Sequence, residues 1–197
     1  MNTILKNTIS ITVITLVAGL ALGVVQDITA GPIATQQEKS KEEAYKTVFE
    51  DADKFEIYSA DDGLTSYLSD NGFTAQTIDE IMVAEDASGE TLGYAFTVTD
   101  SEGYGGDIQF AMGVQNDGTL NGISILSISE TAGLGKKAEE SWYMDLFKGM
   151  GVDKPFPSAP KDLSADDTAL VSGATVTFKG VSKALKNGSD YIKEGAK

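Results

Sequence analysis

The 197-residue sequence contains no cysteine and no histidine. Without cysteine it cannot hold a disulfide, a thiolate-bound iron–sulfur cluster or a cysteine-ligated zinc ion. Without histidine it cannot form a Ser-His-Asp or Cys-His catalytic group, and it lacks the side chain that most readily exchanges protons near neutral pH. If the protein carries electrons, its cofactor must therefore be organic and held by other side chains.

Positive charge is also scarce in this chain. Fifteen Lys and Arg residues face thirty Asp and Glu residues, which gives a formal net charge of −15. A chain this acidic repels phosphate backbones, so nucleic acid is excluded as a plausible partner. The simplest interpretation of the acidity is a well-solvated surface. The length is sufficient for one ordinary domain with a core, rather than for two.

One long hydrophobic run stands near the start of the chain. Residues 8–25, TISITVITLVAGLALGVV, carry no charge. A helix over residues 8–26 would just span a membrane, whereas a cleaved signal peptide is the alternative. We predict an uncleaved anchor, because few positive charges precede the run and no good cleavage site follows it. Lys6 and the amino terminus predict a cytoplasmic tail over residues 1–7, with the rest of the chain outside.

The segment after this run is polar. Residues 27–50 are predicted to be a stalk helix that leads to a domain over residues 51–197. Gly31 and Pro32 are expected to separate the stalk from the membrane span. The apolar residues of the stalk are too sparse for a helix that packs into a core.

The middle of the chain has the pattern of a β-sheet. Four strands are predicted at residues 79–86, 91–100, 107–115 and 120–129. The turns between them contain Gly, Asn and Asp, as in the hairpin signal NDG. Strands joined in sequence by short turns predict an antiparallel meander.

Two helices are predicted after the strands. Within residues 131–150, one apolar face is formed by Ala138, Trp142 and Leu146, with Phe147 beside them. In the last helix, which is expected to end near residues 187–188, a second apolar face is formed by Phe178, Val181 and Leu185. The predicted fold class is therefore α+β, with an antiparallel sheet covered by helices.

The segment ALVSGATVTFKGV, residues 169–181, places hydroxyl groups where the last helix begins. The first turn of a helix has unpaired N–H groups and a partial positive charge, which attract phosphate. Gly173 and Ala174 would let a ligand approach the backbone closely. Helix capping by Ser172 or Thr175 is the alternative, because both residue types are ordinary caps.

The SGATVT segment resembles the flavinylation motif of the FMN-binding domain family. That domain occurs in the G subunit of the Rnf-type ion-translocating ferredoxin:NAD+ oxidoreductase and in the C subunit of the sodium-translocating NADH:quinone oxidoreductase. Residues 16–34 resemble the family's membrane anchor and its exit, and residues 102–126 its central strands with a Gly-Tyr-Gly-Gly turn. ETAGLGKK, residues 130–137, resembles its E-T-P-G-L-G element. The short chain is more similar to the G subunit.

The resemblance implies that the phosphate of FMN is esterified to Thr175 by a separate flavin transferase. The implied cofactor-binding set also contains Ser172, Gly173, Ala174 and Thr177.

The resemblance also implies contacts with the flavin ring. Leu134 would contact one face of the ring, unless it belongs to the core. Glu130 and Thr131 would lie near its polar groups, unless Glu130 is a solvated loop charge. An acidic neighbour would lower the flavin's reduction potential, because it disfavours the negatively charged reduced form.

Four positions depart from the family pattern. Ala132 replaces a proline, and Ser129 stands near a frequent histidine. Ala169 stands where an aspartate is usual, although two aspartates lie just upstream. Phe178 replaces a small hydroxyl residue. None of these changes removes the acceptor hydroxyl of Thr175, but the alanine at position 169 could alter contact with the transferase.

The predicted function is that of an electron-transfer subunit rather than an enzyme by itself. Its FMN would pass electrons within a cell-membrane complex that couples ferredoxin:NAD+ electron transfer to Na+ or H+ export. Its expected partners are the other membrane and redox subunits, especially the flavinylated D subunit. The alternatives are a subunit of a related quinone reductase, a stand-alone flavinylated extracytoplasmic reductase, and an anchored module whose SGAT segment only caps a helix.

Overall fold

The computed structural model describes residues 2–58 and 75–194. Two compact units are present, Met1–Ser40 and Lys41–Lys197. Parts of the predicted domain, residues 59–74 and 195–197, lie outside the described residues.

The first unit consists of the greater part of helix α1 (Thr3–Val48). The expected separation at Gly31 and Pro32 was wrong, because α1 is continuous through both residues. A proline removes one i→i−4 hydrogen bond, and the neighbouring bonds can still hold the helix. The helix is long and apolar enough to cross a membrane, by length and composition. Within the apolar run, the Thr8 and Thr12 hydroxyls each donate to a carbonyl four residues earlier, so they need no water.

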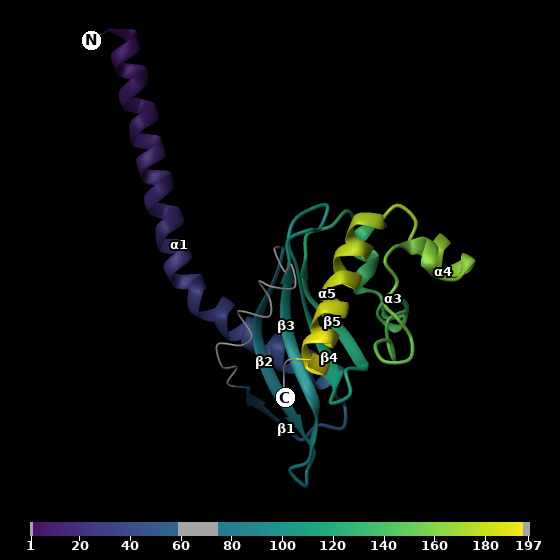
Figure 1. The fold of residues 1–197 in the computed structure, drawn as a ribbon. Helices are drawn as coiled ribbons and strands as arrows, with labels where there is room; N and C mark the ends of the chain where they lie inside the picture. Colours follow the sequence, from purple (N-terminus) through teal and green to yellow (C-terminus); the bar gives the residue numbers. More distant parts are fainter. Residues whose placement is uncertain (1, 59–74, 195–197) are drawn as a thin grey trace. The chain divides into compact units, whose positions relative to one another are not determined.

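The second unit is built on one antiparallel sheet (Figure 1). Its strands are β1 (Lys54–Ile57), β2 (Gln76–Glu85), β3 (Thr91–Asp100), β4 (Ile108–Gln115) and β5 (Leu120–Ile128). They lie in the order β1-β2-β3-β4-β5, and every neighbouring pair is antiparallel. The predicted meander is therefore confirmed. Strand β1 was not predicted, because its four residues, Lys-Phe-Glu-Ile, alternate in polarity but are too few to stand out as a strand.

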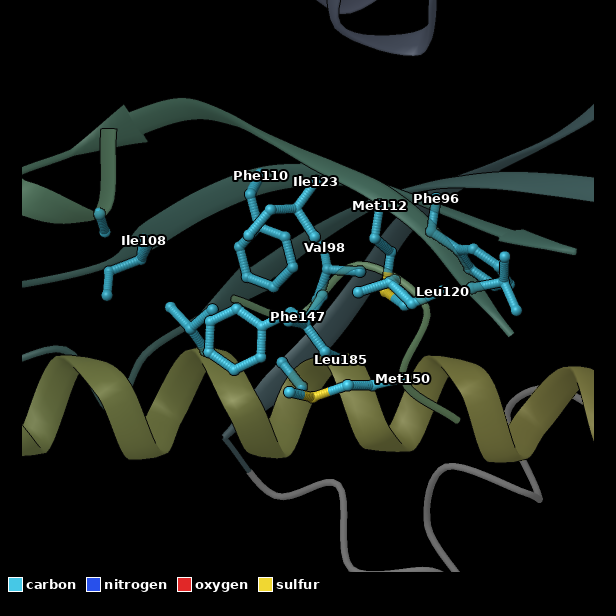
Figure 2. Packing of buried hydrophobic residues seen from close by; sticks show 14 of the residues in the cluster. Phe96, Val98, Ile108, Phe110, Met112, Leu120, Ile123, Phe147, Met150 and Leu185 are labelled. Atoms are coloured by element: carbon cyan, nitrogen blue, oxygen red, sulfur yellow. The ribbon is translucent and has the colours of Figure 1, made fainter. Parts of the chain in front are cut away.

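Helix α5 (Thr175–Glu194) covers one face of the sheet. Alternate strand residues such as Phe96, Phe110 and Met112 point toward it, and Leu185 and Phe147 pack against them (Figure 2). The period of two along a strand and the 3.6-residue period of the helix direct these side chains into one core. This core holds the start of α5 next to the end of β5.

The predicted helix over residues 131–150 is broken. The structure has a 3-10 helix, η1 (Gly135–Glu139), followed by a short helix, α3 (Ser141–Asp145). Glu140 between them has extended backbone angles, φ −82° and ψ 139°. The predicted Ala138 and Phe147 are fully buried, but the break leaves the predicted Trp142 and Leu146 only half-buried and places Tyr143 in the core instead.

The predicted end of the last helix near residues 187–188 was also wrong. Helix α5 continues to Glu194, with Tyr191 and Ile192 buried. A Cβ at Gly188 would lie 2.7 Å from Sδ of Met112, so this glycine allows the helix to approach β4. Tertiary packing therefore overrides the turn tendency of Asn-Gly. Before α5, the expected loop contains η2 (Pro160–Asp162) and α4 (Ala165–Leu170), the latter capped by Ser164.

The last turns of α1 pack on the other face of the sheet. Ala44, Tyr45, Val48 and Phe49 are buried there against Ala84, Ala95 and Ala111. The expectation that this segment would contribute nothing to a core was wrong for these turns. Few apolar side chains suffice because the opposing residues are small and the helix can approach the sheet closely. The compact unit accordingly begins at Lys41, ten residues before the expected domain start at residue 51.

We expect Gly180→Ala to destabilise the full chain, by about 1–2 kcal/mol after the helix-propensity gain of alanine. A Cβ at Gly180 would lie 2.2 Å from Oδ2 of Asp100. Asp100 is fully buried and accepts a 2.7 Å hydrogen bond from Gln76, so it cannot easily move. Thermal unfolding of the detergent-solubilised protein, followed by circular dichroism, measures the loss.

Gly188→Ala is the matched control for this prediction, because it brings the same propensity gain. Its new methyl group would meet the flexible end of Met112, so a smaller loss is expected. A Gly180→Ala protein as stable as the wild type would contradict the close packing at Asp100.

Candidate functional site

A cavity of about 330 Å³ lies at the start of α5. Its lining contains seven of the eight residues proposed from the sequence: Glu130, Thr131, Leu134, Gly173, Ala174, Thr175 and Thr177. The other lining residues are Tyr104, Gly135 and Val176. The eighth proposed residue, Ser172, is exposed on the turn that precedes the helix and does not line the cavity. The fold thus brings together three segments that are distant in sequence.

The turn into α5 depends on Gly173. Its φ of +83° is in the left-handed region, where residues with a Cβ are strained. A Cβ at this position would also lie 2.8 Å from Cδ2 of Leu134, so Leu134 lies directly on this glycine. Ala174 is buried, and Thr175 is exposed as the first residue of the helix. The turn therefore presents the Thr175 side chain at the edge of the cavity.

The helix-capping alternative finds no support at this turn. Within the described part of the chain, neither Ser172 nor Thr175 makes a side-chain hydrogen bond. The N–H groups in the first turn of α5 have no acceptors inside the helix. A positive helix end with free donors and an uncommitted hydroxyl is suited to an anionic group.

The inner end of the cavity is polar. Glu130 is only 8% exposed, and its Oε1 accepts a 2.6 Å hydrogen bond from the Tyr104 N–H. Thr177 is 1% exposed. A Cβ at Gly135 would lie 2.6 Å from Thr177 Oγ1 and 2.7 Å from Glu130 Oε2, so the two oxygens flank this glycine. Among the described residues neither oxygen has a hydrogen-bond partner.

Both oxygens belong to residues that line the cavity, so they are available to form hydrogen bonds with a polar ligand there. Glu130 is not a solvated loop charge.

The mouth of the cavity is apolar. Tyr104 is 78% exposed, Val176 48% and Leu134 41%, which is unusual for large apolar side chains that share one site. Leu134 is therefore not a core residue. Grouped exposed apolar side chains around a concave site are typical of a surface that a ligand or partner covers.

Three lining residues were missed in the sequence. Tyr104 lies in the Gly-Tyr-Gly-Gly turn, where an aromatic residue among glycines is a signal that could have identified it. Gly135 directly follows the proposed Leu134, and Val176 lies between the proposed Thr175 and Thr177. Neither has chemistry of its own, so only the fold reveals their position.

The departures from the family pattern leave this site intact. Ala132 is exposed, and its turn closes without proline through a 3.1 Å hydrogen bond from the Leu134 N–H to the Thr131 carbonyl. Ala169 is exposed on α4, beside the site. Phe178 is fully buried and packs on Tyr143 and Phe147. At this position an aromatic core residue therefore stands where the family has a small hydroxyl residue.

Tyr143 lies in the core near the site. Its hydroxyl is buried and has no hydrogen-bond partner among the residues that the structure describes. Burial raises the pKa of this hydroxyl well above its usual range, and the negative charge of Glu130 raises it further. Tyr143 therefore stays neutral and does not exchange protons with the cavity.

Comparison with known proteins is consistent with this geometry. Residues 103–190 match the family described as FMN-binding domain, a range that includes every lining residue of the cavity. Fold and cavity together define the class: a flavin-binding domain that follows a long apolar helix.

Similarity to curated proteins identifies the family. The chain is 32% identical to the G subunit of the ion-translocating oxidoreductase complex of Cereibacter sphaeroides, over 88% of this chain and 77% of that protein. It is 29% identical to the G subunit of the Na+-translocating ferredoxin:NAD+ oxidoreductase complex of Acetobacterium woodii, with 88% and 84% covered. It is 26% identical to the G subunit of the proton-translocating complex of Clostridium ljungdahlii, with 97% and 92% covered. The chain belongs to the family of G subunits of ion-translocating oxidoreductase complexes.

Proposed function

We propose that this protein is an electron-transfer subunit that holds FMN in the cavity at the start of α5, as part of an ion-translocating membrane complex. The observation that carries the proposal is the cavity itself. It combines an exposed acceptor threonine, Thr175, at a positive helix end with Glu130 and Thr177, two largely buried residues whose side-chain oxygens face the cavity.

The residues of the cavity fit the chemistry of FMN. The phosphate suits the N–H groups of the first turn of α5, and the flat apolar ring suits Leu134, Val176 and Tyr104. The polar edge of the ring suits Glu130 and Thr177. The volume of about 330 Å³ is at the lower end of the range for ligand sites, which leaves part of the cofactor at the surface. When bound, FMN supplies the redox centre.

Exposure favours Thr175 over Thr177 as the residue that carries the flavin phosphate. A transferase must reach the hydroxyl oxygen, and Thr175 is exposed whereas Thr177 is 1% exposed. The ester prevents loss of the cofactor and leaves the ring free to change redox state. Thr177 remains available as a hydrogen-bonding group inside the cavity.

The proposed setting follows from the family and from α1. We expect the helix to anchor the chain, with the FMN domain on the extracytoplasmic side. The partners would be the other complex subunits, including a flavinylated D subunit, together with a flavin transferase for maturation. Na+ and H+ both remain candidates for the transported ion, since this chain is similar both to a subunit named as Na+-translocating and to one named as proton-translocating. Protease accessibility tests this orientation. Digestion of the FMN domain in inverted vesicles but not in intact spheroplasts would refute its extracytoplasmic location.

In-gel fluorescence tests the proposed function. The full chain is produced with and without a flavin transferase, denatured and separated by electrophoresis. A fluorescent band only in the presence of the transferase supports covalent FMN. A colourless, non-fluorescent wild-type protein in both preparations would favour the anchored module without a flavin.

Glu130→Gln is expected to raise the reduction potential of the bound flavin. The substitution removes a buried negative charge, which makes the reduced form easier to reach. We expect a shift on the order of 30 mV, equivalent to about 1.4 kcal/mol for a two-electron couple. Glutamine Oε1 can still accept the Tyr104 N–H, so the turn should be retained. Spectroelectrochemical titration of the flavoprotein measures the shift.

Glu139→Gln serves as the control for this prediction. Its carboxylate is exposed and paired with Lys136, so water and salt screen it. A potential that changes equally in both variants, or in neither, would refute the role of Glu130.

A further inference from the structure

Lys179 lies one helical turn after Thr175 on α5. Residues at positions i and i+4 are neighbours on a helix surface, and long side chains lean back toward the helix N-terminus. The Lys179 ammonium can therefore reach a phosphate held at Oγ1 of Thr175.

The Lys179 side chain has room to make this movement. A second cavity, of about 740 Å³, is lined by Val176, Lys179, Gly180, Lys183 and the segment at residues 101–103, with Ser158. Val176 also lines the flavin cavity, so the two cavities adjoin at this residue. Lys179 is exposed at this junction.

The other lysines around the two cavities are already engaged. Lys183 pairs with Glu102 at 3.1 Å, and Lys136 pairs with Glu139 at 3.2 Å. Lys137 donates a 3.0 Å hydrogen bond to a backbone carbonyl. Within residues 2–58 and 75–194, Lys179 makes no ion pair or side-chain hydrogen bond.

The positive charge of Lys179 opposes the repulsion that this acidic chain exerts on anions. The net charge of −15 opposes the approach of any anionic ligand. We propose that Lys179 is the counter-ion of the FMN phosphate at Thr175: it draws the phosphate to the hydroxyl during attachment and then neutralises the phosphodiester. In the attachment step a P–O bond forms between Thr175 Oγ1 and the flavin phosphate, the phosphoanhydride bond of a flavin dinucleotide donor breaks with a nucleoside monophosphate as the leaving group, and the hydroxyl proton passes to the transferase. This role rests on the proposed function and makes Lys179 a positioning residue, because it acts on the phosphate and not on the redox ring.

The first test measures the initial rate of covalent flavin incorporation into the full chain by a flavin transferase. Lys179→Gln should be about fivefold slower than wild type at about 0.01 M salt and nearly equal at about 1 M, because the Debye length falls from about 30 Å to about 3 Å. Lys179→Arg should retain most of the rate, since it keeps the charge.

Lys186→Gln is the matched control for this test. It removes one charge from the same helix, but it lies about 16 Å along the axis from Thr175. Its rate should stay close to wild type at both salt concentrations. A loss as large as that of Lys179→Gln would mean that net charge, and not position, sets the rate, and the proposal would fall.

The second test compares the phosphorus NMR spectra of the purified flavoproteins at one fixed pH and low salt. The shielding of a phosphorus nucleus depends on the charges next to it, so the resonance of Lys179→Gln should move away from that of the wild type. Lys186→Gln, whose lost charge lies about 16 Å along the axis from Thr175, should leave the resonance in place.

The outcomes separate the two proposals. A wild-type chain that acquires no covalent flavin would overturn the proposed function itself. A flavinylated wild type whose rate and phosphorus resonance match those of Lys179→Gln would overturn only the role of Lys179.

Discussion

Thr175→Val is expected to eliminate covalent flavin from the denatured protein. Valine has the shape of threonine and the same β-branching, so the start of α5 should be preserved while the acceptor oxygen is lost. Because valine has no oxygen that could form the ester, fluorescence on a denaturing gel should fall to background. The measurement uses full-length chains produced with the transferase.

Two variants control for this result. Thr175→Ser keeps a hydroxyl at the same place and should retain covalent flavin. Thr177→Val should also retain it, because the Thr177 hydroxyl is buried inside the cavity. If Thr175→Val remained as fluorescent as wild type, the ester would have to be assigned to another residue.

Loss of the flavin is also expected to stop electron transfer through the whole complex. The chain has no cysteine or histidine, so FMN would be its redox centre. In membranes that contain the complete complex with Thr175→Val, ferredoxin-dependent NAD+ reduction and ion uptake should both collapse. The core beneath α5 is formed by protein side chains alone, so the subunit should remain in the membrane at near-normal abundance.

Immunodetection of the subunit distinguishes a broken relay from a missing subunit. Wild-type abundance of the subunit combined with loss of ferredoxin-dependent NAD+ reduction supports electron transfer through its flavin. Coupled activity retained in a verified flavin-free mutant would mean that electrons bypass this subunit, and the function proposed here would be wrong even if the attachment site is right.

Much of the sheet could be predicted because its signals are local. Strand β3 at residues 91–100 was predicted with its observed bounds, and the turns between β3, β4 and β5 carry glycine, asparagine or aspartate where the chain reverses. The site prediction depended on motifs, and these motifs lie in three segments that the fold does bring together.

Two of the failures come from packing between distant segments. Asn187-Gly188 has the sequence of a helix end, but contact with Met112 keeps it inside the helix. The end of α1 has the composition of a polar stalk, but Tyr45 and Val48 pack on a sheet face of alanines. In both cases the neighbour that decides the outcome lies far away along the chain.

The sequence by itself determined the classes of chemistry open to this protein. Missing cysteine and histidine, an uncharged N-terminal run and an SGAT segment before a helix are properties of composition and order, and they need no fold to be recognised. Only the tertiary structure decided which groups can act. Burial separates the exposed Thr175 from Thr177, which is 1% exposed, and among the described residues it leaves Glu130 Oε2 and Thr177 Oγ1 without protein partners in one cavity. Solvent exposure and unmet hydrogen bonds depend on what packs against each side chain, and that is established only when β5, η1 and α5 come together.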